Sequence, residues 1–350
     1  MHKHLSSIAP SNKSILLLLL IGSIVSPALF VSSFTTPVVS SSAGRTTTTT
    51  SSPSSIPQHY RHCNTILQMS SKVAQFDFSN KRILLTGASS GLGRSLAVQL
   101  TECGASHMIL SGRSVKALEE TKAMCLAAGS PKISILPCDL SDLGQVKQLG
   151  LDTMKETDGS GVDVLINNGG LSSRSRFVDT KIEVDELLMK VNFLAGASLA
   201  KAVVPNMLER GSGAIIWISS VQGLLAIPNR TSYAASKFAV QGYCESLRAE
   251  LASGGVLVHI VSPGYIKTNL SRSAVTGDGG KYNKSDASTE NGATPEYVSK
   301  VIIDSVIKGK ADIIVKPGLS ASAALWVRFF IPGLFQKLMV SRYEKSLQEK

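Results

Sequence analysis

Cysteine is scarce in this chain, and its placement argues against a structural role. The 350 residues contain five cysteines, which are odd in number, widely scattered and never arranged as C-x-x-C. This excludes a disulfide framework and a cysteine-based metal site, so we predict no bound metal. We expect reduced thiols in or near a core, which places the catalytic part in a reducing compartment. The five are Cys63, Cys103, Cys125, Cys138 and Cys244.

Aromatic residues and clustered basic residues are also few. Aromatics make up 5% of the chain, and the lysines and arginines behind a net charge of +11 form no run or stripe. Proteins that bind nucleic acids gather such residues into stacking platforms and basic patches. We therefore expect no nucleic-acid partner. Apolar residues at 43% and charged residues at 17% indicate a globular protein with a sizeable core.

Acidic residues are absent from the first 76 positions. These positions hold five basic residues, so +6 of the net charge belongs to residues 77–350. An apolar run, ILLLLLIGSIVSPALFV at 15–31, follows a mildly basic start. That order predicts a signal peptide over residues 1–33, with an uncleaved signal anchor as the alternative.

Residues 34–76 are rich in serine and threonine, a composition that cannot bury enough apolar surface to fold. Such composition is typical of transit peptides, and a signal followed by a transit-like segment resembles the two-part presequence of complex plastids. A plain anchor followed by a disordered linker is an equal alternative. We therefore expect a membrane-associated protein of the endoplasmic reticulum or a complex plastid. Whether the leader is cleaved stays open.

Beyond the leader, short apolar runs alternate with stretches of helical spacing. This alternation predicts βαβ units, and hence an α/β fold with a Rossmann-type, doubly wound parallel sheet in a single domain over residues 77–317. Ligands of such sheets bind beyond the carboxyl ends of the strands. The apolar runs and the residues after them are KRILLTG (81–87), HMILSGR (107–113), KISILPCDL (132–140), VDVLINNGG (162–170), GAIIWISS (213–220) and VLVHIVSPG (256–264).

A glycine-rich loop, TGASSGLG at 86–93, follows the first run and precedes a helical stretch. Glycines there permit a tight turn and close approach to a pyrophosphate at a helix N-terminus. The loop predicts cofactor contacts from Gly87, Ser89, Ser90, Gly91, Leu92 and Gly93.

The residues after the later runs predict the rest of the cofactor site. Arg113 follows the second run where an acid would bind the ribose of NAD; an arginine suits a 2′-phosphate instead, so we predict NADP(H). A surface arginine is the alternative. Further expected contacts are Asp139, Leu140, Asn167, Gly169, Pro263, Gly264, Ile266 and Thr268.

TSYAASKF at 231–238 places Tyr233 and Lys237 four residues apart, on one face of a helix. A nearby ammonium group favours the phenolate and lowers the pKa of a tyrosine, which would make Tyr233 a general acid or base. A chance pair on a helix is the alternative reading of these two residues alone.

The set TGASSGLG, NNGG, ISS, YAASK and PGYIKT resembles the motif series of the short-chain dehydrogenase/reductase family, in order over residues 79–270. The resemblance implies that Tyr233 is the general acid and that Lys237 binds the nicotinamide ribose and lowers the pKa of Tyr233. It implies that Ser220, thirteen residues before the tyrosine, binds the substrate oxygen, with Ser219 facing away. It implies further that Asn192 holds a relay water and that Thr268 holds the carboxamide.

One departure from the family is Gly169, where alanine is usual, and we expect little loss from it. The family places a mobile lid after PGYIKT, here at about 269–295. The family is usually dimeric or tetrameric, and sequence does not decide between these states.

Residues 318–350 contain a strongly apolar stretch that Arg328, Pro332 and Lys337 interrupt, so it is a poor spanning helix. Its aromatics and basic residues suit a membrane surface; a core or dimer helix is the alternative.

The expected function is NADPH-dependent hydride transfer to a ketone of a lipid-like substrate. The nearer resemblance, to membrane-bound reductases within the family, makes acyl- or alkyl-dihydroxyacetone phosphate a candidate. A steroid, retinoid or 3-ketoacyl substrate, turnover in the oxidative direction, or a non-enzymatic NADP(H) sensor are the alternatives.

Overall fold

The computed structural model describes residues 76–129, 131–315 and 319–348. The predicted leader therefore lies outside the described residues, apart from Phe76.

Seven parallel strands form the sheet, in the order β3-β2-β1-β4-β5-β6-β7. Chain order reverses between β1 and β4, and this is the switch point where ligands of doubly wound sheets bind. The predicted fold is confirmed. The strands are β1 (Arg82–Thr86), β2 (His107–Gly112), β3 (Lys132–Pro137), β4 (Val164–Asn167), β5 (Gly213–Ile218), β6 (Val256–Pro263) and β7 (Asp312–Val315).

Strand β7 was not among the six predicted strands. It lies at the sheet edge, beside β6, and its residues alternate between exposed and buried. Four residues with two exposed positions do not form the continuous apolar run by which the buried strands were found.

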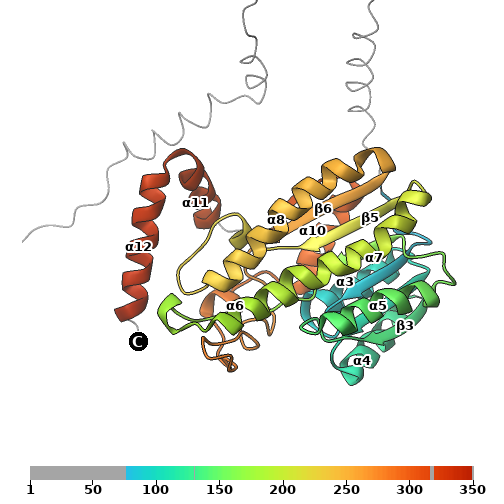
Figure 1. Ribbon diagram of the computed structural model, residues 1–350, viewed down its shortest axis with the longest axis horizontal. Helices are drawn as coiled ribbons and strands as arrows, with labels where there is room; N and C mark the ends of the chain where they lie inside the picture. The colour runs from blue at the N-terminus through green and yellow to red at the C-terminus, as the bar shows by residue number, and fades with distance from the viewer. Residues whose placement is uncertain (1–75, 130, 316–318, 349–350) are drawn as a thin grey trace, which may run out of the picture. The chain divides into compact units, whose positions relative to one another are not determined.

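Helices cover both faces of the sheet, as Figure 1 shows for the front layer of α5, α7 and α8. In β1, Ile83 and Leu85 pack with α3, α4 and α10 on one face, while Leu84 packs with α5, α7 and α8 on the other. Period-two alternation of an all-apolar strand thus builds two cores. The helices of these layers are α3 (Gly91–Glu102), α4 (Val115–Ala128), α5 (Leu143–Glu156), α7 (Ala195–Glu209), α8 (Thr231–Leu251) and α10 (Pro295–Ile307).

The predicted helix start at Thr294 and Pro295 is confirmed. The Thr294 hydroxyl accepts a hydrogen bond from the Tyr297 amide at 3.3 Å, and Pro295 is the first residue of α10. Proline is favoured there because the first amides of a helix have no partner within it.

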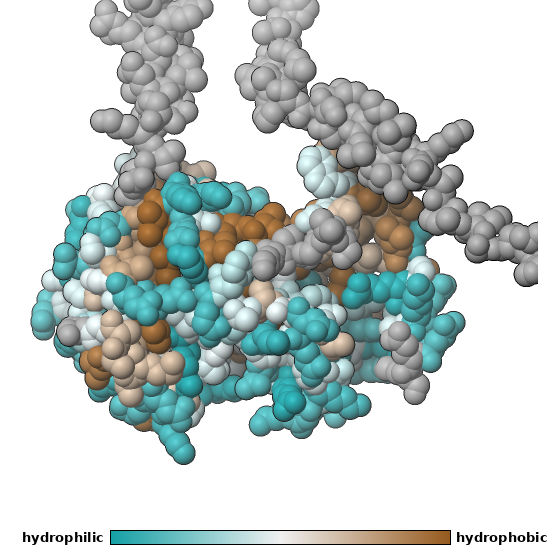
Figure 2. Space-filling view, turned by 180° about the vertical axis from the view of Figure 1, so that it is seen from behind, coloured by the Kyte–Doolittle hydropathy of each residue, from teal (hydrophilic) through white to brown (hydrophobic). Residues whose placement is uncertain are grey.

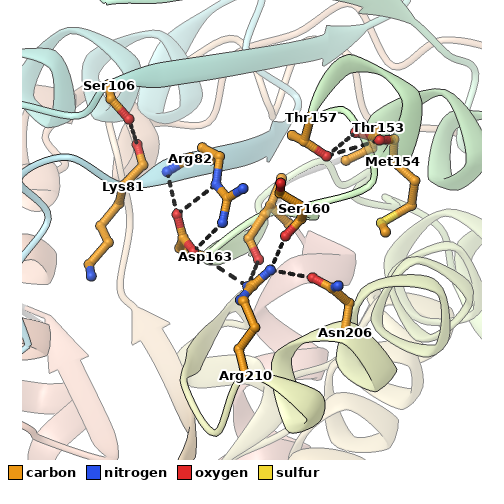
Figure 3. A network of polar contacts seen from close by, with 11 residues as sticks. Lys81, Arg82, Ser106, Thr153, Met154, Thr157, Ser160, Asp163, Asn206 and Arg210 are labelled. Carbon is orange, nitrogen blue, oxygen red and sulfur yellow. Dashed lines mark hydrogen bonds and ion pairs between the residues drawn. The ribbon is translucent and has the colours of Figure 1, made fainter.

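A polar network ties β1 to β4 at the edge opposite the ligand side (Figure 3). Asp163 accepts hydrogen bonds from the Arg82 amide at 2.9 Å and from Nε and Nη2 of the same residue at 3.0 and 2.9 Å. Arg210, just after α7, lies 3.4 Å from Asp163 and also binds the carbonyl oxygen of Ser160. The network holds the two central strands in register at their amino ends.

The long helical run between β4 and β5 consists of α6 (Ile182–Met189), the π-helix η3 (Lys190–Leu194) and α7. By length and composition, Ile182–Glu209 could span a membrane, but 44% of its most apolar window is buried inside the fold. Its apolar residues Leu199 and Val203 pack on the sheet, so core packing explains the composition.

The C-terminal stretch forms two helices, α11 (Leu319–Phe330) and α12 (Pro332–Gln348). Pro332 begins the second helix, which explains the break. The main core clusters among the described residues contain no residue of this hairpin. Its contacts with the body include a cation–aromatic contact and a hydrogen bond. The Arg328 guanidinium lies 4.8 Å from the Phe238 ring centre, and Asn229 donates to the Ser346 hydroxyl at 3.0 Å.

Candidate active site

A cavity of about 1830 Å³ opens at the carboxyl ends of the strands. Its wall takes residues from the loops after β1 to β6, from the start of α8, from the segment after β6 and from the hairpin α11–α12. Small-molecule sites usually measure roughly 300–1,000 Å³. The cavity is therefore large enough to hold a dinucleotide and a second, extended ligand together.

The glycine-rich loop forms one end of this cavity and fits a phosphate. Gly91, with φ +54°, begins α3, and the preceding Ser90 makes no side-chain cap, so the first amides of the helix remain available. A Cβ on Gly93 would lie 2.1 Å from the Gly87 carbonyl oxygen, so this turn requires glycine. The loop is held from behind by Arg94, which donates to the Ser89 carbonyl oxygen at 2.7 Å. An uncapped helix start in a rigid glycine turn binds pyrophosphate.

The loops after β2 and β3 supply the adjoining wall. Arg113 is exposed there, and the buried Ser111 hydroxyl has no hydrogen-bond partner among the described residues. The Asp139 carboxylate accepts from the amide and hydroxyl of Ser141 at 2.9 and 2.8 Å, which fixes its own turn. Leu140 fills the space beside Gly169, since a Cβ on that glycine would lie 2.4 Å from Leu140 Cδ1.

Two neighbouring asparagines have different environments. Asn167 does not line the main cavity; it borders a small second cavity with Asn192 and Trp217. No described residue forms a hydrogen bond with its buried Oδ1. Asn168, which was not in the predicted set, lines the main cavity and donates to the carbonyl oxygens of Thr86 and Gly87 at 2.9 and 3.2 Å. The strand alternation that turns one asparagine inward turns the next toward the loop.

Tyr233, Lys237 and Ser220 meet in the wall of the cavity, together with the segment from Pro263 to Thr268. The Lys237 ammonium nitrogen lies 5.8 Å from the centre of the Tyr233 ring and donates to the Ile218 carbonyl oxygen at 2.9 Å. The Ser219 hydroxyl is directed to the Lys237 carbonyl oxygen at 3.4 Å, along the back of the helix. Ser220 Oγ accepts from the Gln222 amide at 3.1 Å.

Burial controls the titration of both helix residues. It raises the pKa of Tyr233 above its usual value, against the opposing effects of the Ser220 hydroxyl and the charges of Arg230 and Arg174. Burial also lowers the pKa of Lys237 to about 8. The expectation that a neighbouring ammonium brings the pKa of Tyr233 below its usual value is therefore wrong for this arrangement, because desolvation outweighs the nearby cations. At neutral pH, Tyr233 holds its proton.

Asn192 lies in the π-helix η3, and both polar atoms of its side chain are hydrogen-bonded within the protein. Its Oδ1 accepts from the Leu171 amide at 2.7 Å, and its Nδ2 donates to the Leu171 carbonyl and the Ser236 hydroxyl, both at 2.9 Å. A π-bulge loosens backbone hydrogen bonding and is frequent at functional sites. A water that serves Lys237 would therefore bind the Asn192 backbone carbonyl or the remaining lone pair of Oδ1.

The remaining predicted residues also lie in the main cavity wall. These are Gly87, Ser89, Ser90, Gly91, Leu92, Gly93, Arg113, Asp139, Leu140, Gly169, Pro263, Gly264, Ile266 and Thr268. Among the described residues, no group of three His, Cys, Asp or Glu side chains is placed to hold a metal ion.

Sequence reasoning missed Arg174, Arg230 and Tyr265, which line the same cavity. The segment 269–295 covers this side and contains the short α9 (Ala287–Glu290). It is tied to the body, since Asp286 pairs with Arg174 at 2.6 Å and with Arg230 at 3.0 Å. The sequence did contain a signal for Arg230. It is the N-cap residue of α8 and lies three residues before Tyr233, which is in the first turn of the same helix, so its side chain could be expected near the site.

Residues 81–278 match the sequence family described as short chain dehydrogenase. The chain belongs to the short-chain dehydrogenase/reductase family. Dehydrogenase/reductase SDR family member 7B of Danio rerio is 40% identical over 276 residues, which cover 77% of this chain and 88% of that protein. The resemblance of NNGGLSSRS, AIPNRTSYAASK and IPGLFQKLMVSR to this member is consistent with that similarity.

Solved structures of the family share the fold. A short-chain dehydrogenase/reductase from Burkholderia phymatum in complex with NAD has a TM-score of 0.65 at 23% identity, covering 74% of this chain and 96% of that one. A short-chain dehydrogenase from Sphingobium yanoikuyae in complex with NADPH has a TM-score of 0.60 at 25% identity, covering 74% and 95%. Family membership makes this chain an oxidoreductase acting on CH–OH and C=O groups.

Proposed function

We propose that this short-chain dehydrogenase/reductase is an NADPH-dependent reductase of a lipid-like ketone, with Tyr233 as the general acid. The observation that carries the proposal is the convergence of Tyr233, Lys237 and Ser220 on one cavity, whose lining also includes the apolar residues Ala321, Ala324, Leu338 and Met339 of the C-terminal hairpin. The glycine turn before α3 and the orphaned Ser111 hydroxyl fit a bound dinucleotide at the other end.

NADPH is favoured over NADH by charge. Arg113 follows β2 and lines the cavity, and no carboxylate stands at the end of that strand to bind ribose hydroxyls. A guanidinium binds the 2′-phosphate of NADP(H) with charge-assisted hydrogen bonds. Thr268 and the Pro263–Ile266 segment would hold the nicotinamide end, where the bound cofactor supplies a hydride.

The residues of this chain then complete the reduction. Tyr233 is protonated at neutral pH and donates its proton to the carbonyl oxygen as that oxygen gains charge. Ser220 donates a hydrogen bond to the same oxygen and stabilises the developing charge. Lys237, below its pKa of about 8, is cationic and favours the tyrosinate that forms.

The lipid-like substrate is supported by the C-terminal hairpin. Ala321, Ala324, Leu338 and Met339 line the cavity and extend it beyond the reacting groups. The outer side of α11 exposes Trp326 at 63% and Phe329 at 80%. Figure 2 shows brown, hydrophobic atoms at the right of the view, in the part of the molecule where Figure 1 places α11. Aromatics on an exposed helix insert into a membrane interface, from which a lipid substrate reaches the cavity.

The full chain in detergent, assayed by loss of reduced nicotinamide absorbance, tests the proposal. The panel contains acyl-dihydroxyacetone phosphate, a steroid ketone, retinal and a 3-ketoacyl thioester, each with NADPH and NADH. Turnover of one class with NADPH preferred is expected. Tyr233→Phe is expected to lower kcat by about 10²- to 10⁴-fold with NADPH binding retained, because it removes the acid and keeps the ring. Undiminished turnover by this variant would overturn the mechanism.

A further inference from the structure

Two buried arginines share one carboxylate on the substrate side of the cavity. Arg174 belongs to the segment after β4, Arg230 caps the start of α8, and Asp286 precedes α9. Their side chains are 10%, 12% and 18% exposed. Both guanidiniums bind the same oxygen, Asp286 Oδ2. The group therefore holds one positive charge that no carboxylate within it neutralises.

The two arginines differ in what they have left to bind. Arg174 donates from Nε and Nη2 to Asp286 at 3.0 and 2.6 Å, from Nη2 to Ser271 at 3.2 Å, and from Nη1 to Ser172 and to the Ser173 carbonyl at 2.7 and 2.8 Å. The guanidinium of Arg230 makes one hydrogen bond among the described residues, from Nη2 to Asp286 at 3.0 Å. Arg174 therefore uses all three of its guanidinium nitrogens within the fold, whereas Arg230 keeps a free edge of its guanidinium, with donors that no described residue accepts.

That free edge lies beside the reacting groups. Arg230 lines the cavity with Tyr233 and Tyr265, and its guanidinium carbon is 5.9 Å from the centre of the Tyr265 ring. Its charge acts on Tyr233, where it opposes the rise of the tyrosine pKa that burial causes. A ketone held at Tyr233 would thus place its neighbouring substituents against Arg230.

The rest of this side of the cavity carries the same sign of charge. Among the described lining residues the single carboxylate is Asp139, in the loop after β3 at the cofactor end. The segment after β6 and helix α12 add four exposed basic side chains to the lining, beyond the two arginines. They are Arg272, Lys281, Arg342 and Lys345.

A buried cation with most of its donors unused is costly unless a ligand supplies the missing acceptors. The planar guanidinium matches a carboxylate or phosphate, because two parallel donors meet two oxygens. We infer that Arg230 binds an anionic group, a carboxylate or a phosphate, on the ketone substrate, a specificity that rests on the proposed reductase function. The apolar residues that the hairpin contributes to the lining, among them Leu338 and Met339, then receive the chain of the same amphiphilic molecule.

Matched substrate pairs test this inference. One pair is an acyl-dihydroxyacetone phosphate and its dephosphorylated form, and the other is a long-chain keto acid and its methyl ester. Each is assayed with the full-length protein, Arg230→Gln, Arg230→Lys and Lys201→Gln. Lys201 is an exposed residue of α7 outside the cavity lining, so its variant controls for the loss of one charge.

We expect the wild type to prefer the anionic member of at least one pair, and the preferred pair distinguishes a phosphate from a carboxylate. Arg230→Gln is expected to lower kcat/KM for that anion by about 10- to 100-fold, chiefly through KM, because it removes a charge-assisted contact. The neutral partner is expected to change much less, which also shows that the variant is folded. Arg230→Lys should restore part of the loss, and Lys201→Gln should change neither member.

Equal turnover of both members of each pair by the wild type, or an equal loss on both members in Arg230→Gln, would overturn the inference while leaving the reductase intact. If no ketone is turned over, the proposed reductase function fails instead. Calorimetric measurement of palmitate and hexadecanol binding then tests on its own whether Arg230 forms an anion site. Palmitate bound more tightly than hexadecanol by the wild type but not by Arg230→Gln supports it. Equal binding of the two in the wild type contradicts it.

Discussion

Burial, more than any neighbouring charge, sets the pKa shifts of Tyr233 and Lys237. Tyr233 and Lys237 are i and i+4 on α8, and both are buried in the cavity wall. The neutral forms of both are therefore favoured, which suits an acid that must keep its proton until the carbonyl oxygen gains charge. The spacing in the sequence identifies the pair, but whether the pKa of Tyr233 rises or falls depends on how the side chain is packed.

Lys237 gives the first residue-scale prediction. Its pKa falls from an ordinary 10.5 to about 8 on folding. Between these pH values the unfolded chain holds a proton that the folded chain has lost, so the free energy of unfolding rises with pH across that window. Lys237→Met lacks this contribution. We expect any excess stability of the variant at pH 7 to shrink, by up to about 3 kcal/mol, as pH rises toward 10.5.

Urea unfolding of the wild type and the variant at several pH values measures that difference, and other titrating groups cancel between the two proteins. A difference in the free energy of unfolding that stays constant from pH 7 to pH 10.5 would show that Lys237 is not desolvated.

At the scale of elements, the two ends of the strands differ in function: the carboxyl ends surround the cavity, and the amino ends of β1 and β4 are joined by a polar network. The carboxyl edge carries the cavity, while the amino edge is secured by Asp163, Arg82 and Arg210 (Figure 3). Burial alone would raise the pKa of Asp163, but the hydrogen bonds from Arg82 outweigh it and hold the pKa below its usual value. This carboxylate therefore stabilises the pairing of β1 with β4.

Asp163→Asn tests this at the element scale. The variant should lower the free energy of unfolding at pH 7 by about 1–3 kcal/mol, since it leaves Arg82 without its charged acceptor. Because the folded pKa is depressed, the stabilisation exists above the unfolded pKa of about 4 and is lost as pH falls below it. Denaturant unfolding measures the difference in the free energy of unfolding between the wild type and Asp163→Asn. This difference should be smaller at pH 3 than at pH 7. Asp152→Asn on α5, where a partly exposed carboxylate pairs with Lys155, is the control for the loss of one acidic charge.

At the scale of the whole molecule, the C-terminal hairpin contributes residues to the cavity wall but none to the described hydrophobic core clusters. Its residues line the cavity but belong to none of the described core clusters. A chain ending at residue 317 should therefore fold and bind NADPH with a nearly unchanged Tm. We expect kcat/KM for a long-chain ketone to fall by about tenfold or more, because roughly 1.4 kcal/mol of apolar contact is lost, equivalent to about two buried methylenes. A short-chain ketone should be affected little.

The same truncation, made in a chain that also lacks residues 1–76, should no longer sediment with phospholipid vesicles. The leaderless chain that keeps the hairpin serves as its control. Sedimentation of both would place membrane binding elsewhere in the protein, and an equal loss on long and short ketones would show that the hairpin supports the fold rather than the substrate site.

Most of the fold and of the cavity wall could be read from local pattern. Six strands of seven are predicted because each contains a mostly apolar run bounded by turn residues, whereas β7 is only four residues long and has an exposed side. The glycine turn, Tyr233 and Lys237 were found because a turn and an i, i+4 pair are local in sequence. Asn167 and Asn168 border different cavities because a step of one residue reverses the side of a strand, and only packing shows which side faces the main cavity.

The amino-acid sequence by itself determined the doubly wound sheet, the family and the residues around Tyr233, because these depend on periodicity and on spacings of a few residues. Only the tertiary structure decided the rest. It brought together Arg174, Arg230 and Asp286, which are up to 112 positions apart, and it added the α12 wall opposite them. It also reversed the expected pKa shift of Tyr233. Long-range contacts and desolvation depend on which surfaces are removed from water together, and no local pattern encodes that.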